Sequence, residues 1–422
     1  MSELEPRLRI CLISEKFPIL GRTPARGFIA PIARGLVKAG HQVSVIAWSN
    51  PFGESEIEQE GIKTYFLAGA NPNRTELFSR RIHQKFTQLH AQEPFHIVHS
   101  LTQSAYRVGY EKKPMGFAIA YDVSATQMGY LFSLIGMADN IPTSQMKTAY
   151  KVVYRFLESY YTKDRLILKN ADSVFVHSPQ QKLALERYYL YPDLKTYNIP
   201  YGIEISDLSQ RQGSEELRQK LGIAKSAEVV VTVSEMTEKQ DVINLLQAFQ
   251  SVVIKKPSAR LIIVGYGPAF SALEYEMLNL ALGSHVIMTG SVPPYEISSY
   301  IDLADVFVNI SGRSSGYDPN LLEAMIQEKI IIGSEVSPIA TFVEDGIDGF
   351  LIRPADVYAL SNLILGIFLG QISPGPMGKN ARAKALDIFD TQKMLQGIMS
   401  AYAQMLKRCP WVKKNLPLVK QN

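Results

Sequence analysis

The feature that most constrains the fold is a repeated alternation of short β-branched runs with longer stretches of helical periodicity. Five runs of this kind occur in the first half of the chain: Leu8–Ser14, Val43–Trp48, His96–Ser100, Phe117–Tyr121 and Ser173–His177. Between the first two, apolar residues recur at helical spacing from Phe28 to Ala39, and Gly40 follows as a stop signal. Strands that alternate with helices in this way form βαβ units and parallel sheets.

A second series of the same kind begins after a polar stretch near residue 206. Its six runs are Val229–Val233, Leu261–Val264, Val286–Thr289, Val306–Ile310, Ile330–Gly333 and Phe350–Ile352. The pattern predicts an α/β protein with two doubly wound domains, 1–203 and 204–392. A last helix and a basic surface tail are expected over 393–422. Ligands of such sheets lie beyond the carboxyl ends of the strands, so we expect the functional site in a cleft between the halves.

Composition excludes several protein classes. A chain of 422 residues with 46% hydrophobic and 20% charged residues is long enough for two or three globular cores and is not disordered. It has no run of 18 apolar residues and no export signal, so we expect a cytoplasmic protein without a membrane span. Only two cysteines are present, too few for a disulfide framework or a cysteine-based zinc site.

Charge is distributed unevenly along the chain. Residues 1–200 carry 24 basic and 17 acidic residues, a net charge of +7, whereas residues 201–404 carry 15 and 23, a net charge of −8. The tail 405–422 adds five basic residues and no acidic ones. No nucleic-acid-binding motif accompanies this charge, so no nucleic-acid partner is expected. The basic half and tail suit an anionic lipid surface, which predicts peripheral contact with the inner face of the membrane.

Two local patterns suggest a binding site. Gly265-Tyr-Gly-Pro268 follows a buried run, where it is equally consistent with a tight turn and with a loop whose backbone N–H groups approach a phosphate. Glu323 opens an apolar helix, where a carboxylate either accepts hydrogen bonds from ribose hydroxyls or complements the helix N-terminus. No metal site is indicated, because two histidines without a third ligand do not make one.

Six segments together resemble the family-4 (group 1) glycosyltransferases. They occur in that family's order over nearly the whole chain: Lys38-Ala-Gly-His41, Ala171-Asp-Ser173, Ile199-Pro-Tyr-Gly-Ile-Glu204, Ile263-Val-Gly-Tyr-Gly-Pro268, Leu321-Leu-Glu-Ala-Met325 and Glu344-Asp-Gly-Ile-Asp-Gly-Phe350. One such segment alone means little, whereas six in register make a chance match improbable.

The resemblance implies the GT-B fold, with 1–203 on the acceptor side, 204–392 on the nucleotide-sugar side and 393–422 crossing back. It also implies a retaining, metal-independent hexosyltransferase without a cofactor. The substrates would be a nucleotide-sugar donor and a glycan, lipid or protein acceptor.

Several family positions are replaced in this chain. The Arg and Lys that neutralise the donor diphosphate correspond to Glu235 and Gln240, although Lys239 lies one residue away. Tyr121 stands where the family has a histidine near the donor sugar, and Ser315 stands where it has the first of two glutamates. Loss of cations beside a developing anion lowers the rate of transfer, so these replacements put catalysis in doubt.

Two hypotheses therefore stay open, a divergent glycosyltransferase and an inactive relative that binds a ligand or a protein partner. Under the first, the catalytic candidates are Tyr121, Lys239 and Ser315. The donor-binding candidates are the positions that match the family's donor loops: Gly21, Gly265, Gly267, Arg313 and Glu323. A third hypothesis, a binding module for anionic lipid or glycan, depends only on the basic first half and tail.

Overall fold

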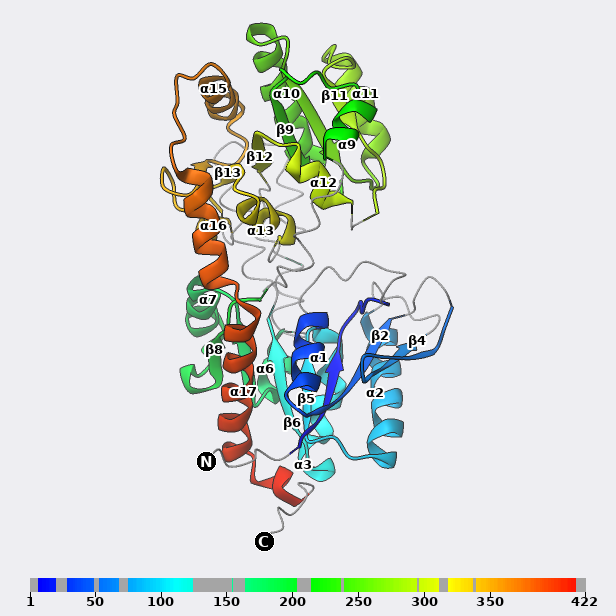
Figure 1. Ribbon diagram of the computed structural model, residues 1–422. Coiled ribbons are helices and arrows are strands. Elements are labelled where there is room, and N and C mark those ends of the chain that lie inside the picture. The colour runs from blue at the N-terminus through cyan, green and yellow to red at the C-terminus, as the bar shows by residue number, and fades with distance from the viewer. Residues whose placement is uncertain are drawn as a thin grey trace. The chain divides into compact units, whose positions relative to one another are not determined.

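The chain folds into two compact α/β units, seen in the computed structural model of Figure 1. Unit 1 contains the described residues up to 202 and those from 389 onward, and unit 2 contains those from 214 to 388. The structure describes residues 7–19, 29–48, 53–67, 75–123, 154, 164–202, 214–236, 239–293, 296–310, 318–336 and 339–414. Two separate, largely parallel sheets confirm the predicted fold class.

The sheet of unit 1 has eight strands in the order β3-β4-β2-β1-β5-β6-β7-β8. Their bounds are β1 Arg9–Ile13, β2 Gln42–Trp48, β3 Glu56–Gln59, β4 Ile62–Leu67, β5 Ile97–Ser100, β6 Ala118–Asp122, β7 Ser173–Val176 and β8 Thr196–Asn198. All neighbours pair in parallel except β3 and β4. The five predicted runs are the five strands β1, β2, β5, β6 and β7.

The three strands that the sequence did not predict lie toward the margins of this sheet. The β3–β4 hairpin turns at Glu60 and Gly61, both with positive φ, and β3 alternates exposed with partly buried residues. Strand β8 has three residues and pairs only with β7. Strands as polar as β3 or as short as β8 lack the apolar run that identifies a buried strand. Strand β4 has apolar and buried residues, and the sequence analysis missed it.

Helices cover the sheet of unit 1 on both faces. Their bounds are α1 Ile29–Lys38, α2 Thr75–Gln92, η1 Gln103–Glu111, α3 Lys112–Met115, α6 Asp164–Asn170, α7 Pro179–Tyr189, η4 Asp193–Lys195, α17 Thr391–Arg408 and η5 Pro410–Lys414. Helix α17 contacts α1 and β6, whereas η1 contacts α2 and α6. The C-terminal helix is therefore part of unit 1, although nearly 190 residues of unit 2 precede it in the chain.

The described residues directly after α17 are packed instead of lying on the surface as expected, and residues 415–422 lie outside the described part of the chain. The indole N–H of Trp411 donates to the carbonyl oxygen of Phe117 at 2.9 Å, and Val412 and Cys409 are buried. The indole ring of Trp411 is thus held to the rest of unit 1 by this hydrogen bond, and Lys113 Nζ lies 5.4 Å from the centre of the ring. Residues 409–412 therefore form a docked segment, which the composition of the tail did not indicate.

The sheet of unit 2 has six parallel strands in the order β11-β10-β9-β12-β13-β14. Their bounds are β9 Val229–Val233, β10 Arg260–Val264, β11 Val286–Met288, β12 Val306–Asn309, β13 Ile330–Ser334 and β14 Phe350–Ile352. Each corresponds to one predicted run. The helices are α9 Ser214–Lys220, α10 Lys239–Lys255, α11 Phe270–Asn279, α12 Ile297–Asp302, α13 Pro319–Ile326, α14 Ile339–Phe342, α15 Val357–Phe368 and α16 Met377–Ile388.

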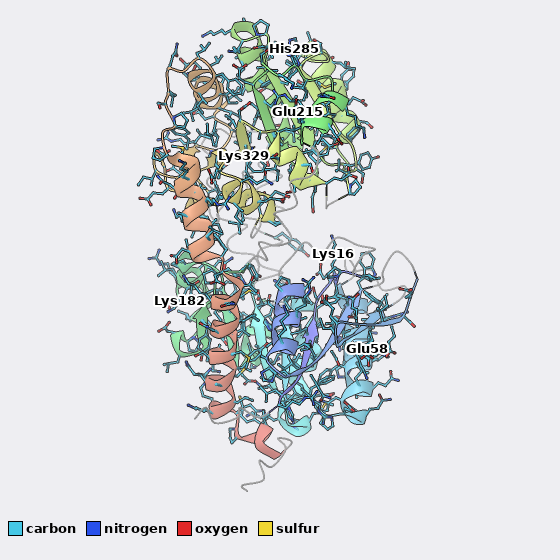
Figure 2. The ribbon with its side chains drawn as sticks, in the orientation of Figure 1. Lys16, Glu58, Lys182, Glu215, His285 and Lys329 are labelled. Atoms are coloured by element: carbon cyan, nitrogen blue, oxygen red, sulfur yellow. The ribbon has the colours of Figure 1, made fainter. Side chains whose placement is uncertain are left out.

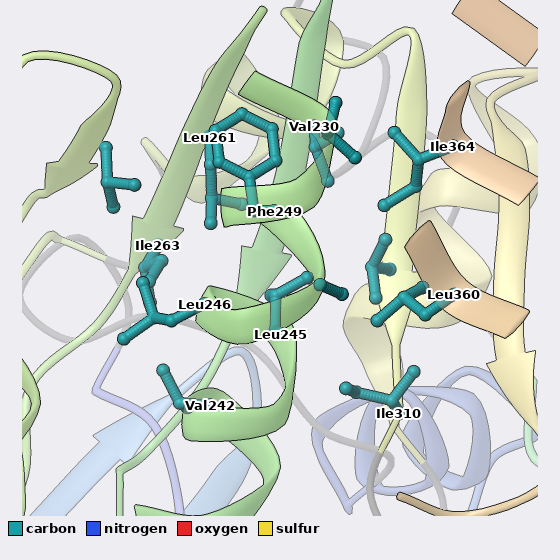
Figure 3. Packing of buried hydrophobic residues seen from close by; sticks show 14 of the residues in the cluster. Val230, Val242, Leu245, Leu246, Phe249, Leu261, Ile263, Ile310, Leu360 and Ile364 are labelled. Atoms are coloured by element: carbon teal, nitrogen blue, oxygen red, sulfur yellow. The ribbon is translucent and has the colours of Figure 1, made fainter. Parts of the chain in front are cut away.

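Helix α10 lies at the centre of the core of unit 2. Its apolar side chains at positions 242, 245, 246 and 249 follow the i, i+3, i+4, i+7 spacing of a buried helix face. Figure 3 shows them between Leu261 and Ile263 of β10 on one side and Leu360 and Ile364 of α15 on the other. This packing fixes the first turn of α10 at the carboxyl edge of the sheet.

Among the described residues, no helix is both long enough and apolar enough to cross a bilayer.

Candidate functional site

The two glycines of the Gly265–Pro268 loop allow two backbone loops of unit 2 to touch. A Cβ atom on Gly265 would lie 2.1 Å from the carbonyl oxygen of Ser234, and one on Gly267 would lie 1.9 Å from that of Glu235. Gly265 also has φ +127°, a conformation that other residues rarely adopt. The loop after β10 therefore lies directly on the loop after β9, and only glycine fits at either contact.

Hydrogen bonds hold this pair of loops in place. The N–H of Ala269 donates to the carbonyl oxygen of Met236 at 3.0 Å, and the N–H of Gly265 donates to Thr289 Oγ1 at 3.3 Å. Met236 is buried with φ +46°, so the loop after β9 is held in an unusual backbone conformation. The loop is thus a tight, hydrogen-bonded turn at the carboxyl edge of the sheet. This agrees with the tight-turn interpretation of the sequence, whereas its role as a ligand loop stays a prediction.

The first turn of α10 follows at the same edge. Lys239 is the first residue of the helix and is exposed, and Glu235 is also exposed. Gln240, at the family's Lys position, donates from Nε2 to Asn244 Oδ1 of the same helix at 3.0 Å. A lysine at a helix N-terminus is electrostatically unfavourable unless an anion lies beside it. Lys239 is thus an exposed cation next to Gln240 in the first turn of α10, where Asp241 supplies a negative charge.

Asp318 is a carboxylate of this edge that the sequence did not identify. It caps α13, where Oδ1 accepts from the N–H of Asn320 at 2.8 Å and from its side-chain amide at 2.9 Å. Asn309, the last residue of β12, donates to the other oxygen. Burial raises the pKa of Asp318, although these donors oppose the shift. The Asp-Pro sequence ahead of an apolar helix is the capping signal by which it could have been found.

The capped helix positions Glu323, which is 1% exposed in its second turn. Helix α13 follows β12, and β12 pairs with β9, so the loops after β9, β10 and β12 meet at one carboxyl edge. Gly265, Gly267, Lys239 and Glu323 are thus brought to the same edge of unit 2. Arg313 and Ser315 lie outside the described residues, as does Gly21 in unit 1.

In unit 1, Tyr121 occupies the apolar core. It is 4% exposed and packs in a cluster with Val123, which follows β6, and with residues of α6, β7 and α7: Ile167, Leu168, Val174 and Leu185. Successive side chains of a strand point to opposite faces, so Asp122 projects toward the face covered by α17.

Lys16 lies in the segment after β1, where it is exposed (Figure 2). It supplies positive charge at the carboxyl edge of this sheet.

The carboxylate of Asp122 is the centre of a buried polar network that the sequence did not predict. Its Oδ1 accepts from His177 Nε2 at 2.6 Å and from the Tyr201 hydroxyl at 2.7 Å. His99 Nε2 lies 3.7 Å from Oδ2, and His99 Nδ1 lies 2.7 Å from the hydroxyl oxygen of Tyr402 in α17. The sequence signal was a histidine in each of two otherwise apolar strand runs, His99 in one and His177 at the end of the other.

The charge of Asp122 is maintained by its neighbours. Burial alone would raise the pKa of this carboxyl group, because it removes water from the charged form. The positive charge and hydrogen bonds of His177, together with those of His99, outweigh burial and hold the pKa well below its usual range. Asp122 is therefore ionised in the folded protein. Among the described residues, no group of three His, Cys, Asp or Glu side chains could hold a metal ion.

Two family models match the chain in tandem. The Glycosyl transferase 4-like domain matches residues 26–202, and Glycosyl transferases group 1 matches residues 213–384. Together they cover most of both units. The chain belongs to the group 1 glycosyltransferases of the GT-B fold. The predicted resemblance is confirmed.

Curated relatives in this family are distant. The α-monoglucosyldiacylglycerol synthase of Streptococcus pneumoniae is 26% identical over 208 residues, which are 45% of this chain and 46% of the relative. The N-acetyl-α-D-glucosaminyl L-malate synthase of Bacillus anthracis is 23% identical over 192 residues, which are 46% of this chain and 49% of the relative. The chain therefore spans about half the length of these curated relatives.

Two solved structures share the fold over nearly the whole chain. Sucrose-phosphate synthase of Thermosynechococcus elongatus superposes with a TM-score of 0.76 at 22% identity, covering 95% of this chain and all of that one. Anabaena HepE in complex with UDP-glucose superposes with a TM-score of 0.69 at 18% identity, covering 94% of this chain and all of that one. At these identities the likeness shows the GT-B fold.

Replacing Gly267 by Ala is expected to destabilise unit 2 by about 1–3 kcal/mol, because the added Cβ meets backbone that cannot move alone. Gly283→Ala is the matched control, since its Cβ would find its nearest neighbour at an ordinary 3.5 Å from a Leu278 methyl group. Urea unfolding followed by circular dichroism measures both variants. Equal stability of the two would show that the loop contact tolerates a side chain.

Asp122→Asn is expected to lower the free energy of unfolding by about 3–5 kcal/mol near pH 6, because it leaves His177 without its buried anion. Since the folded pKa of Asp122 is lowered, its contribution is present above the unfolded carboxyl pKa of about 3.9 and is lost as the pH falls below it. The difference in the free energy of unfolding between wild type and variant should therefore become smaller as the pH falls from 4 to 2. Asp193→Asn, which removes an exposed partner of Lys182, should change stability little at any pH.

Proposed function

We propose that this protein transfers a sugar from a nucleotide-sugar donor to a glycan or lipid acceptor, with retention of the anomeric configuration. The observation that carries the proposal is the carboxyl edge of the unit 2 sheet. There the glycine loop, the start of α10 and the capped helix α13 bring the matching donor positions of the group 1 family together. Residues 204–392 form the donor side of the proposed enzyme and residues 1–203 the acceptor side.

Each group at the edge has a chemical role in this proposal. The diphosphate is the leaving group and gains negative charge as the glycosidic bond to the sugar breaks, so it requires positive charge or N–H donors nearby. The first-turn N–H groups of α10 and the ammonium group of Lys239 supply both. Glu323 accepts hydrogen bonds from the ribose hydroxyls. Backbone of the Gly265–Pro268 loop lies against the nucleotide, with Gly21 and Arg313 as further candidates and Tyr121 and Ser315 at the family's catalytic positions.

The relatives support these substrate classes. HepE was solved with UDP-glucose, and the name of the pneumococcal relative specifies a glucosylated diacylglycerol. A lipid acceptor also agrees with the net charge of +7 over residues 1–200, which favours an anionic membrane surface. We therefore propose a nucleotide-sugar as donor and a glycan or lipid at the inner face of the membrane as acceptor.

A second function is favoured by one specific observation. Gln240 is turned along α10 toward Asn244, and Glu235 is an exposed anion in the preceding loop, so neither family cation position contributes positive charge. A relative altered in this way would bind a ligand or a protein partner without transferring sugar. The presence of transfer separates the two functions, because only the first requires the leaving diphosphate to be stabilised.

Glu323→Gln is expected to weaken nucleotide-sugar binding at least about tenfold, because an amide replaces the carboxylate that accepts two ribose hydroxyls. Isothermal titration calorimetry against UDP, GDP, ADP and their common sugar conjugates measures the dissociation constant. Glu215→Gln in α9, labelled in Figure 2 and paired only at the surface with Lys225, is the control. Unchanged affinity of a folded Glu323→Gln protein would overturn the donor-site assignment, and transfer of sugar by the wild type would exclude the inactive alternative.

The double substitution Glu235→Arg with Gln240→Lys is expected to tighten binding of the same nucleotide-sugar by about tenfold or more, because it replaces an anion and a neutral group with two cations beside the diphosphate. The gain should shrink as salt is raised from 50 to 500 mM. Lys255→Gln at the far end of α10 changes the net charge of unit 2 without touching this edge and serves as the control. If affinity falls or stays constant, the diphosphate does not lie at the start of α10.

A further inference from the structure

Tyr266 presents an exposed aromatic ring at the carboxyl edge of the unit 2 sheet. It lies in the loop after β10, and 63% of its surface is exposed. An aromatic ring is mostly apolar, so its contact with water is unfavourable and a ligand that covers the ring gains free energy. The donor groups proposed above include only the backbone of this loop, which leaves the ring without a role.

The residues around Tyr266 fix the place of its ring. Gly265 and Gly267, its two neighbours in the chain, lie against the carbonyl oxygens of residues 234 and 235. The N–H of Phe270 donates to the carbonyl oxygen of Gly267 at 3.0 Å, which closes the turn into α11. The ring of Phe270 lies 5.1 Å from that of Tyr266, at 40° between planes, and packs against the core of unit 2. The loop therefore holds the Tyr266 ring outward and Phe270 supports it from the helix.

The loop after β11 lies beside this ring-bearing loop. Gly265 and Gly290 form an antiparallel bridge, and Thr289 Oγ1 accepts from the N–H of Gly265 and donates to the carbonyl oxygen of Gly290. A Cβ on Gly290 would meet no atom within 4 Å, so there is open space at the bridge. The described residues of the two loops, 265–269 and 289–293, include no charged and no amide side chain. A ligand at this place meets an aromatic ring and backbone groups, a combination that suits a planar, uncharged group.

The Tyr266 ring is one loop away from the proposed position of the diphosphate. Strand β10 pairs in parallel with β9, with Val264 opposite Val233 at their carboxyl ends. The loop after β9 leads into the first turn of α10, and neighbouring strands lie about 4.8 Å apart. In a nucleoside diphosphate only a ribose separates the base from the phosphates. A diphosphate at the start of α10 therefore leaves the base within reach of the loop that carries Tyr266.

We propose that Tyr266 binds the base of the nucleotide-sugar by stacking its ring on the face of the base. This inference rests on the proposed function, because it requires a nucleotide at the carboxyl edge of unit 2. Every nucleobase is planar and has a π-face, so stacking stabilises uracil, adenine and guanine alike. Tyr266 thus contributes affinity for the nucleoside part of the donor, whereas Lys239 and the first turn of α10 act on the phosphates.

Tyr266→Ala is expected to weaken binding of UDP, GDP or ADP, whichever the wild type binds, by about tenfold or more, because the stacking surface is lost. Isothermal titration calorimetry of the full chain measures the dissociation constant. The substituted side chain is exposed, so urea unfolding should show wild-type stability for this variant. Tyr266→Phe keeps the ring and is expected to bind as the wild type does.

Tyr275→Ala is the matched control, since it removes another exposed ring, 68% exposed in α11, and should leave the affinity unchanged. A wild type that binds a nucleotide while Tyr266→Ala binds it equally well would overturn the stacking role and leave the proposed donor site intact. A wild type that binds none of the three nucleotides would overturn the donor site and the stacking role together.

Tyr266→Trp provides a measurement that does not depend on a loss of affinity. The two native tryptophans, Trp48 and Trp411, both belong to unit 1, so the added indole reports on unit 2. Stacking of a base on this indole is expected to quench its fluorescence at saturating nucleotide, whereas inorganic pyrophosphate, which has no base, should not. Tyr275→Trp should show no quenching with either ligand. Equal quenching of the two variants by nucleotide, or none in Tyr266→Trp, would contradict the proposal.

Discussion

The buried carboxylate of Asp122 is the interaction on which the arrangement of unit 1 depends. A carboxylate that is 2% exposed is tolerated only if donors replace the water that it has lost. Here those donors come from β5, from the turn after β7, from the segment after β8 and, through His99, from α17. Strand β5 and helix α17 thereby meet through the contact of His99 with Tyr402, which are 303 residues apart in the chain. The C-terminal helix is part of the first unit for this reason as well as for its apolar contacts.

Unit 2 depends on a different constraint, the direct contact of two backbone loops. The carbonyl groups of residues 234 and 235 occupy the space where side chains at 265 and 267 would lie. Close packing of these loops places the start of α10 and the glycine turn at one edge, and α13 reaches the same edge through its Asp318 cap. A rigid frame of this kind suits a ligand site, because backbone N–H groups are already oriented before a ligand arrives.

The structure shows what surrounds two positions that the sequence analysis predicted to differ from the family pattern, Tyr121 and Gln240. Tyr121 fills an apolar cluster between the sheet and helices α6 and α7, where a histidine would bury a polar ring without the same packing. Gln240 is satisfied within its own helix. Both side chains are therefore accommodated in the fold, Tyr121 by apolar packing and Gln240 by a hydrogen bond. Lys239 and Glu323 remain at the edge where the proposed donor binds.

The sequence by itself determined the alternation of strands and helices, the division into two sheets and the glycine loop, because apolar periodicity and turn residues act over short distances. Eleven strand runs were predictable on that basis, whereas the β3–β4 hairpin and the short edge strand β8 were not. Only the tertiary structure decided that Asp122, His99, His177, Tyr201 and Tyr402 form one network. These contacts join residues far apart in the chain, and whether a buried polar side chain finds a partner depends on which distant elements the sheet order brings beside it.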